Sequence, residues 1–249
     1  MTNPFSRRSF VKVVGLASAS AAGAVASAGN SLLPARTSSN SSASGAAQAA
    51  PPPAYRSYEF FTPEEALFME AAVDRLIPAD EVGPGALELG AAYFIDQQLM
   101  SVYGLGDRMY LEGPFAQGTP TQGYQLPLRP RELYRIGIGE TNGYCRAQFD
   151  ATFAELSTSQ QETVLQALEA DEATLETLTA SLFFNQLWQN TVEGYFCDPI
   201  YGGNRDMASW EMIGFPGARS RFIDDIGKAE RVTYPPVSLA QIVAQPGIQ

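Results

Sequence analysis

Apolar residues recur at intervals of three and four along most of the chain beyond residue 60, a spacing typical of helices packed on a core. The first helix carries a clear start signal. Thr62 suits the capping position, Pro63 the first helical position, and Glu65 the closing position of a capping box. Pro78 is expected to end this helix. Its apolar face comprises Met69, Ala72, Val73, Leu76 and Ile77.

The same periodicity predicts three further helices and one dominant core stripe. A second helix is expected from about residue 86 to 101, and a third from Pro130 to Phe153. A fourth begins with Ser157 as cap and Gln160 at the box position. The expected inward positions are Leu89, Tyr93, Ile95 and Leu99 in the second helix and Leu133, Ile136, Tyr144 and Phe149 in the third. The strongest stripe, interpreted as core rather than as a cofactor site, is Phe184, Leu187, Trp188, Thr191, Val192 and Tyr195.

Residues 103–130 are too rich in glycine and proline for regular elements, so a long ordered loop is expected there. No run of alternating polar and apolar residues predicts a strand, and no internal repeat is present. The predicted fold class is therefore all-α, an irregular helical domain with long ordered loops.

The first 28 residues have the features of a twin-arginine export signal. Ser6, Arg7, Arg8, Phe10 and Lys12 form the motif, and an apolar segment follows it directly. This signal predicts a periplasmic protein. Proteins that use the route fold before they cross, commonly because a cofactor must be inserted in the cytoplasm or because a partner must be bound there first. Since the chain shows no cofactor ligands, we favour the second reason; the alternative is that the protein folds rapidly on its own.

The apolar segment is about 16 residues long, shorter than the roughly 20 that a spanning helix needs, so cleavage is favoured over a permanent anchor. Residues 29–56 are rich in Ser, Ala, Gly and Pro and are interpreted as a flexible linker. The predicted organisation is a signal peptide (1–28), a linker (29–56) and a single helical domain (57–249).

The composition excludes several kinds of chemistry. The 249 residues include no histidine and two cysteines, so the usual general base, zinc ligand and haem ligand are missing. No catalytic residue, metal site or cofactor-binding residue is predicted in this chain. There are 27 acidic and 16 basic residues; loss of Arg7, Arg8 and Lys12 with the leader would leave a net charge of −14. This charge argues against nucleic acid and anionic lipid as partners.

The two cysteines, Cys145 and Cys197, leave three possibilities open for an oxidising compartment: a disulfide within the chain, a disulfide to a partner, or two buried thiols. Neighbouring acids such as Glu64 and Glu65, Asp80 and Glu81, or Asp224 and Asp225 are interpreted as solvated surface or helix-terminal residues rather than an acid/base pair. The glycine motifs at residues 104–107 and 201–204 are interpreted as tight turns.

Ten segments, in order, resemble the gluconate 2-dehydrogenase subunit 3 family. They are residues 61–65 (FTPEE), 74–80 (DRLIPAD), 83–86 (GPGA), 92–96 (AYFID), 113–115 (GPF), 123–128 (GYQLPL), 132–135 (ELYR), 190–196 (NTVEGYF), 198–206 (DPIYGGNRD) and 213–218 (IGFPGA). The resemblance implies a small subunit without a redox centre, in a complex associated with the inner membrane. The implied partners are a large flavoprotein subunit that holds FAD and a multihaem cytochrome c subunit that holds haem c.

The resemblance also implies that the flavoprotein crosses the membrane through the twin-arginine translocase on this chain's signal. It offers no catalytic residues; it suggests partner contacts in the loop 113–128 and in the segment that begins at residue 201. The candidate contact residues are Tyr124, Tyr201, Asn204, Arg205, Asp206, Trp210 and Phe215. For Tyr201, Trp210 and Phe215 the alternative of covering their own core stays open. The competing functions are an independent periplasmic binding or scaffold module and a hydrolase that uses two carboxylates.

Overall fold

The computed structural model describes residues 57–116, 118–119, 125–219, 221–230 and 232–244. Residues Arg56–Gln249 form one compact unit, which is described by itself. The helices in the described residues are α2 (Pro63–Leu76), α3 (Ala91–Met100), α4 (Pro130–Phe149), α5 (Thr158–Glu169), α6 (Ala180–Phe196), α7 (Ala208–Ile213) and α8 (Leu239–Ala244). Short 3-10 helices are η2 (Phe153–Glu155), η3 (Pro199–Tyr201), η4 (Arg205–Met207) and η5 (Ile223–Asp225). These residues contain no strand, only two isolated bridges, so the all-α prediction is confirmed for them.

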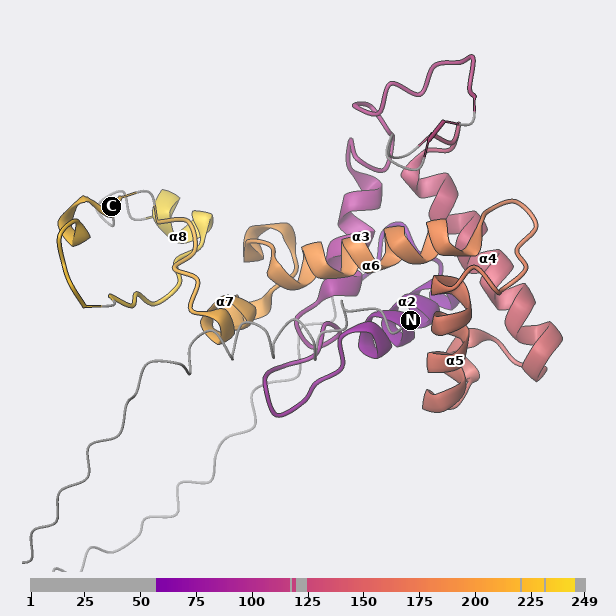
Figure 1. The fold of residues 1–249 in the computed structure, drawn as a ribbon, viewed down its shortest axis with the longest axis horizontal. Helices are drawn as coiled ribbons and strands as arrows, with labels where there is room; N and C mark the ends of the chain where they lie inside the picture. The colour runs from indigo at the N-terminus through magenta and orange to yellow at the C-terminus, as the bar shows by residue number, and fades with distance from the viewer. Residues whose placement is uncertain (1–56, 117, 120–124, 220, 231, 245–249) are drawn as a thin grey trace, which may run out of the picture. The chain divides into compact units, whose positions relative to one another are not determined.

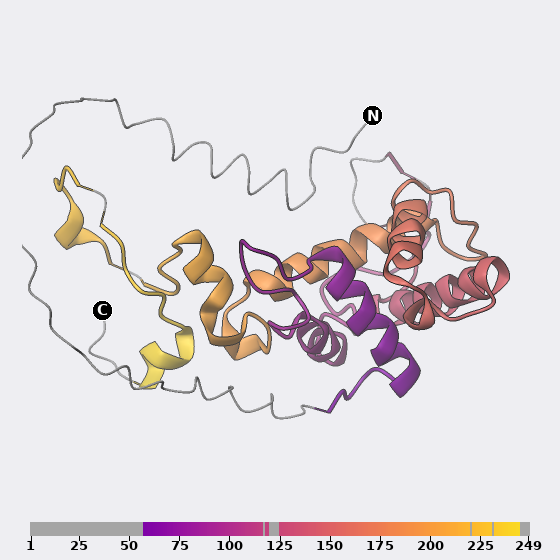
Figure 2. The same cartoon turned by 90° about the horizontal axis from the view of Figure 1, so that it is seen from below.

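Helix α6 is the centre of the fold. It contacts α2, α3, α4, α5 and α7. Figure 1 shows α6 lengthwise, with α4 and α5 near its N-terminal end and α7 beyond its C-terminal end; Figure 2 shows the same elements from below. Its predicted stripe is confirmed as core, because Leu187, Thr191 and Tyr195 are buried and Trp188 and Val192 pack partly buried against the cluster.

The predicted start of α2 is confirmed in detail. The Thr62 amide donates to the Glu65 carboxylate at 2.8 Å, and the Glu65 amide donates to the Thr62 hydroxyl at 3.3 Å. The helix ends at Leu76, immediately before Ile77 and Pro78. The start of α5 is confirmed as well, since the Ser157 amide donates to the Gln160 side chain at 3.0 Å.

Two predicted boundaries are wrong. The second helix begins at Ala91 rather than near residue 86, because Gly90 has φ 83° and ψ 24°, a left-handed conformation that a right-handed helix excludes. The third helix ends at Phe149, because Asp150 is also left-handed (φ 57°), and Phe153 lies fully buried in η2 instead. Between α3 and α4 the described residues form turns without a helix, as predicted.

The start of this loop is fixed to α6 by a polar network. The Tyr103 and Tyr134 hydroxyls both donate to Oδ1 of Asn190, at 3.1 and 2.9 Å, and Gln186 donates to the Tyr103 oxygen at 2.7 Å. Burial raises the pKa of both tyrosines above the ordinary value, so the hydroxyls stay protonated and keep donating.

No helix in the described part of the chain is long and apolar enough to cross a membrane. The predicted export signal (Ser6, Arg7, Arg8, Phe10 and Lys12) and the linker lie outside the described residues.

Candidate partner-binding surface

The segment from Asp198 to Phe215 follows the C-terminal end of α6 and is held against the body by internal hydrogen bonds. Asp198, which is buried, caps η3 by accepting from the Ile200 amide at 3.0 Å. Its second oxygen accepts from the Leu239 amide at the start of α8, at 2.7 Å. One carboxylate therefore joins the turn to the C-terminal part of the chain.

Asn204 is an internal residue, so its predicted role as a partner contact is wrong. Its side chain is fully buried; Nδ2 donates to the Cys197 carbonyl at 2.9 Å, and Oδ1 accepts from the amide and hydroxyl of Ser209 at 3.0 and 2.7 Å. It also adopts φ 42°, a left-handed conformation that asparagine tolerates better than most residues. Asn204 thus links the end of α6 to the start of α7.

Gly203 lets this turn approach α6 closely. A Cβ at this position would lie 2.1 Å from the Gly194 carbonyl oxygen and 2.8 Å from Sγ of Cys197. Backbone atoms of the helix cannot move aside, so only glycine fits there. The next residues are strained, because Asp206 and Met207 have φ of 57° and 59° without being glycine.

Trp210 belongs to the core, which favours the second of the two alternatives left open for it. It is 6% exposed, and its indole nitrogen donates to the Phe196 carbonyl at 2.8 Å. Phe215 packs edge-on against this ring, with centroids 5.2 Å apart, yet remains 43% exposed. Trp210 therefore supports Phe215 from beneath.

The remaining described candidates are exposed. Tyr201 is 52% exposed, and Arg205 and Asp206 lie on the surface of the same turn; Tyr124 lies outside the described residues. Exposed apolar side chains accompany them, namely Ile200 on η3 and Ile213 at the end of α7. Exposed aromatic, aliphatic and arginine side chains on a rigid support are typical of protein–protein interfaces. We refer to Ile200, Tyr201, Arg205, Asp206, Ile213 and Phe215 as the turn surface.

Four of the six carboxylates considered for catalysis are engaged in structure. Glu65 caps α2 and pairs with Arg135, Glu64 pairs with Arg146 at 2.8 Å, and Asp80 accepts from the Val82 amide at 2.9 Å. Hydrogen bonds from Lys228 and Tyr234 hold the pKa of Asp225 below its usual range. Within the described residues no group of three or more cysteine or acidic side chains is arranged to hold a metal ion.

Both cysteines are free thiols, so the disulfide within the chain is not formed. Cys145 is fully buried among core side chains, and Cys197 is half-buried with Sγ donating to the Gly194 carbonyl at 3.4 Å. Burial raises the pKa of each thiol to about 11, which keeps both protonated at neutral pH. The other two possibilities, a disulfide to a partner and two buried thiols, stay predictions; Cys145 is buried and Cys197 is half-buried.

Sequence reasoning missed the carboxylate that fixes the entry of the chain into the domain. Asp96 on α3 is fully buried and accepts from the amides of Glu59, Phe60 and Phe61 at 2.8, 3.0 and 2.9 Å. Arg135 on α4 also holds this segment in place, since it donates to the Phe60 carbonyl at 2.6 Å and covers the Phe60 ring. The sequence did offer one signal for this role, because Asp96 is the only acidic residue in a helix whose other inward positions are apolar.

The described domain is thus helical, and the turn surface presents exposed aromatic, aliphatic and arginine side chains on a backbone fixed by hydrogen bonds. The family described as gluconate 2-dehydrogenase subunit 3 matches residues 63–217. Because this match covers more than half of the chain, the chain belongs to that family, as the sequence resemblance predicted. No curated protein and no solved structure gives a significant match.

Effects of substitution should separate the internal from the exposed residues of the turn. Asn204→Ala removes three side-chain hydrogen bonds and leaves buried partners unsatisfied, so we expect the free energy of unfolding to fall by about 2–4 kcal/mol. Arg205→Ala, at the exposed neighbour, should change it by less than about 0.5 kcal/mol. Urea unfolding followed by circular dichroism measures both. Equal stability of the two variants would contradict the structural role of Asn204.

Proposed function

We propose that this chain is the non-catalytic small subunit of a membrane-bound periplasmic dehydrogenase resembling gluconate 2-dehydrogenase. In this proposal a large partner subunit binds FAD and oxidises the sugar acid, and a multihaem cytochrome c subunit passes the electrons on. The observation that carries the proposal is the family match over residues 63–217. The lack of histidine throughout the sequence supports a non-catalytic role.

The proposed contribution of this chain is twofold. Its leader carries the folded flavoprotein through the twin-arginine translocase, and its helical domain then stabilises the assembled complex. The turn surface supports the second part, because it presents Tyr201, Arg205 and Phe215 on a backbone already fixed by Asp198 and Asn204. Such pre-ordering lowers the entropic cost of binding a partner.

The test is affinity purification of the tagged full-length protein from detergent-solubilised membranes of its own host. We expect a flavoprotein and a cytochrome c to co-purify, with flavin and haem absorption that the chain expressed alone lacks. Tyr201→Ala with Arg205→Ala should lower the yield of both partners, whereas Val102→Ala, at a similarly exposed apolar residue outside the turn surface, should not. A monomer that co-purifies with no partner would support the binding or scaffold module instead.

A further inference from the structure

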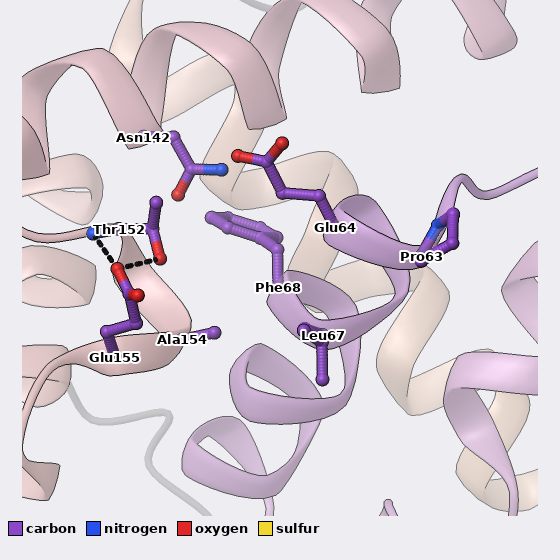
Figure 3. A pocket seen from close by; sticks show the side chains of 8 residues that line it. All are labelled: Pro63, Glu64, Leu67, Phe68, Asn142, Thr152, Ala154 and Glu155. Atoms are coloured by element: carbon purple, nitrogen blue, oxygen red, sulfur yellow. Dashed lines mark hydrogen bonds between the residues drawn. The ribbon is translucent and has the colours of Figure 1, made fainter.

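A pocket of about 370 Å³ opens between the first turns of α2, the middle of α4 and η2. The turn surface contributes no residue to it. Figure 3 shows its lining side chains: Pro63, Glu64, Leu67, Phe68, Asn142, Thr152, Ala154 and Glu155. Its volume is at the low end of the roughly 300–1,000 Å³ typical of ligand sites, enough for one large side chain and part of its backbone.

Asn142 directs an unused donor into this pocket. The residue is only 3% exposed, and its Oδ1 accepts from the Phe153 amide at 3.0 Å. Because that bond fixes which end of the amide is oxygen, Nδ2 must point the other way, and Figure 3 shows it on the side of Phe68 and Glu64. Nδ2 donates to no atom among the described residues. This donor is therefore available to an acceptor that enters the pocket.

The rest of the lining is apolar at its base and acidic at its rim. Phe68 is buried beneath the pocket, while Leu67 is 58% exposed. Glu155 accepts from the amide and hydroxyl of Thr152, and these bonds hold the pKa of Glu155 below its usual range. Glu64 is paired with Arg146, which lies outside the lining. No lining residue is basic, and Arg146 is already paired with Glu64, so Glu155 is the carboxylate left to face a cation.

We infer that this pocket binds a segment of a partner protein in which an apolar side chain adjoins an arginine or lysine. The apolar side chain packs on Phe68 and Leu67, a backbone carbonyl of the segment accepts from Nδ2 of Asn142, and the basic side chain faces Glu155. Each of these three contacts meets an observed feature: the exposed apolar area of Leu67, a donor of Asn142 without a partner among the described residues, and the Glu155 carboxylate, which has no ion pair of its own there. The inference rests on the proposed role as a subunit and adds a second contact site to the turn surface.

Leu67→Lys is the sharpest test, because it places a positive charge where the basic side chain of the partner must approach and changes only an exposed position of α2. We expect the yield of co-purified flavoprotein or cytochrome from solubilised membranes to fall about tenfold or more. Val102→Lys is the matched control, since Val102 is 56% exposed and lies outside the pocket; its yield should equal that of the unmodified protein.

A photo-crosslinking phenylalanine analogue at position 67 identifies the occupant in intact membranes. We expect a cross-link to a subunit that co-purifies stoichiometrically, mapped by mass spectrometry to an apolar residue next to an arginine or lysine. Asn142→Asp keeps the acceptor for the Phe153 amide and removes the donor, so it should weaken the same cross-link; its thermal unfolding shows whether the variant is folded.

The outcomes separate this inference from the proposed function. If Leu67→Lys co-purifies with its partners like the control, or if position 67 cross-links only to a small molecule or to no subunit, the pocket inference is overturned while the proposed function stands. If the unmodified protein co-purifies with no partner, both are overturned.

Discussion

Replacement of Arg7 and Arg8 by lysine is expected to abolish dehydrogenase activity at the periplasmic face and to leave the flavoprotein soluble in the cytoplasm. Both substitutions preserve charge, so a general electrostatic effect on the leader cannot explain a loss. Arginine presents a planar fork of donors that lysine lacks, and a receptor built for the arginine pair discriminates on that geometry. Activity is measured in intact cells with a membrane-impermeant acceptor and compared with activity in lysates.

The matched control is Arg36→Lys, a change of the same kind in the predicted linker, which should leave export unchanged. The decisive measurement is the location of the large subunit, which cell fractionation and flavin absorption determine. Active flavoprotein confined to the cytoplasm of the double variant is the expected pattern. Normal export of the large subunit in that variant would refute the carrier role, because the partner would then reach the periplasm on a signal of its own.

The helices could be predicted because their signals are local. Caps such as Thr62 with Glu65 and Ser157 with Gln160 act within one turn, so the sequence alone determines them. The wrong boundaries have a different origin. The apolar pattern of the second helix extends back to Leu89, which is indeed buried. Leu89 nevertheless lies in a turn before the helix, and this turn ends at Gly90. Burial and helix formation need not coincide at the same residue.

The turn surface could be predicted only in part, because motif membership does not separate exposed from internal residues. Asn204, Arg205 and Asp206 are consecutive, yet the first is fully buried and the others are exposed. That division depends on the left-handed backbone at Asn204, which turns its side chain towards Cys197 and Ser209. This conformation depends on contacts between the turn and the end of α6. Those contacts form only when the chain folds, so the sequence of the turn does not reveal them.

Asp96 gives the second large expected effect. Asp96→Ala removes a buried carboxylate that accepts three backbone amides, at Glu59, Phe60 and Phe61, and leaves those donors without a partner. Hydrogen bonds to a charged acceptor are worth about 1.5–3 kcal/mol each and are not additive, so we expect a loss of about 3–5 kcal/mol in the free energy of unfolding. For a domain of this size the melting temperature should fall by roughly 10 °C.

Two companion variants test the cause of this loss. Asp96→Asn has nearly the same shape but keeps only one acceptor oxygen, so its stability should lie between those of the unmodified protein and Asp96→Ala. Asp107→Ala, at an exposed aspartate in the loop after α3, should leave the melting temperature nearly unchanged. If Asp96→Ala melts like Asp107→Ala, the three amides do not depend on the carboxylate and the structural role assigned to Asp96 is wrong.

The Asp96 and arginine-pair variants should fail in export for opposite reasons, which makes them informative together. Asp96 fixes the point where the chain enters the domain, and the twin-arginine route carries proteins that fold before they cross. Asp96→Ala should therefore lower the amount of folded small subunit, and with it the amount of flavoprotein bound in the cytoplasm. The arginine variant should instead accumulate there as a folded small subunit bound to its partner. Co-purification from the cytoplasmic fraction distinguishes the two, since only the arginine variant should retain the flavoprotein.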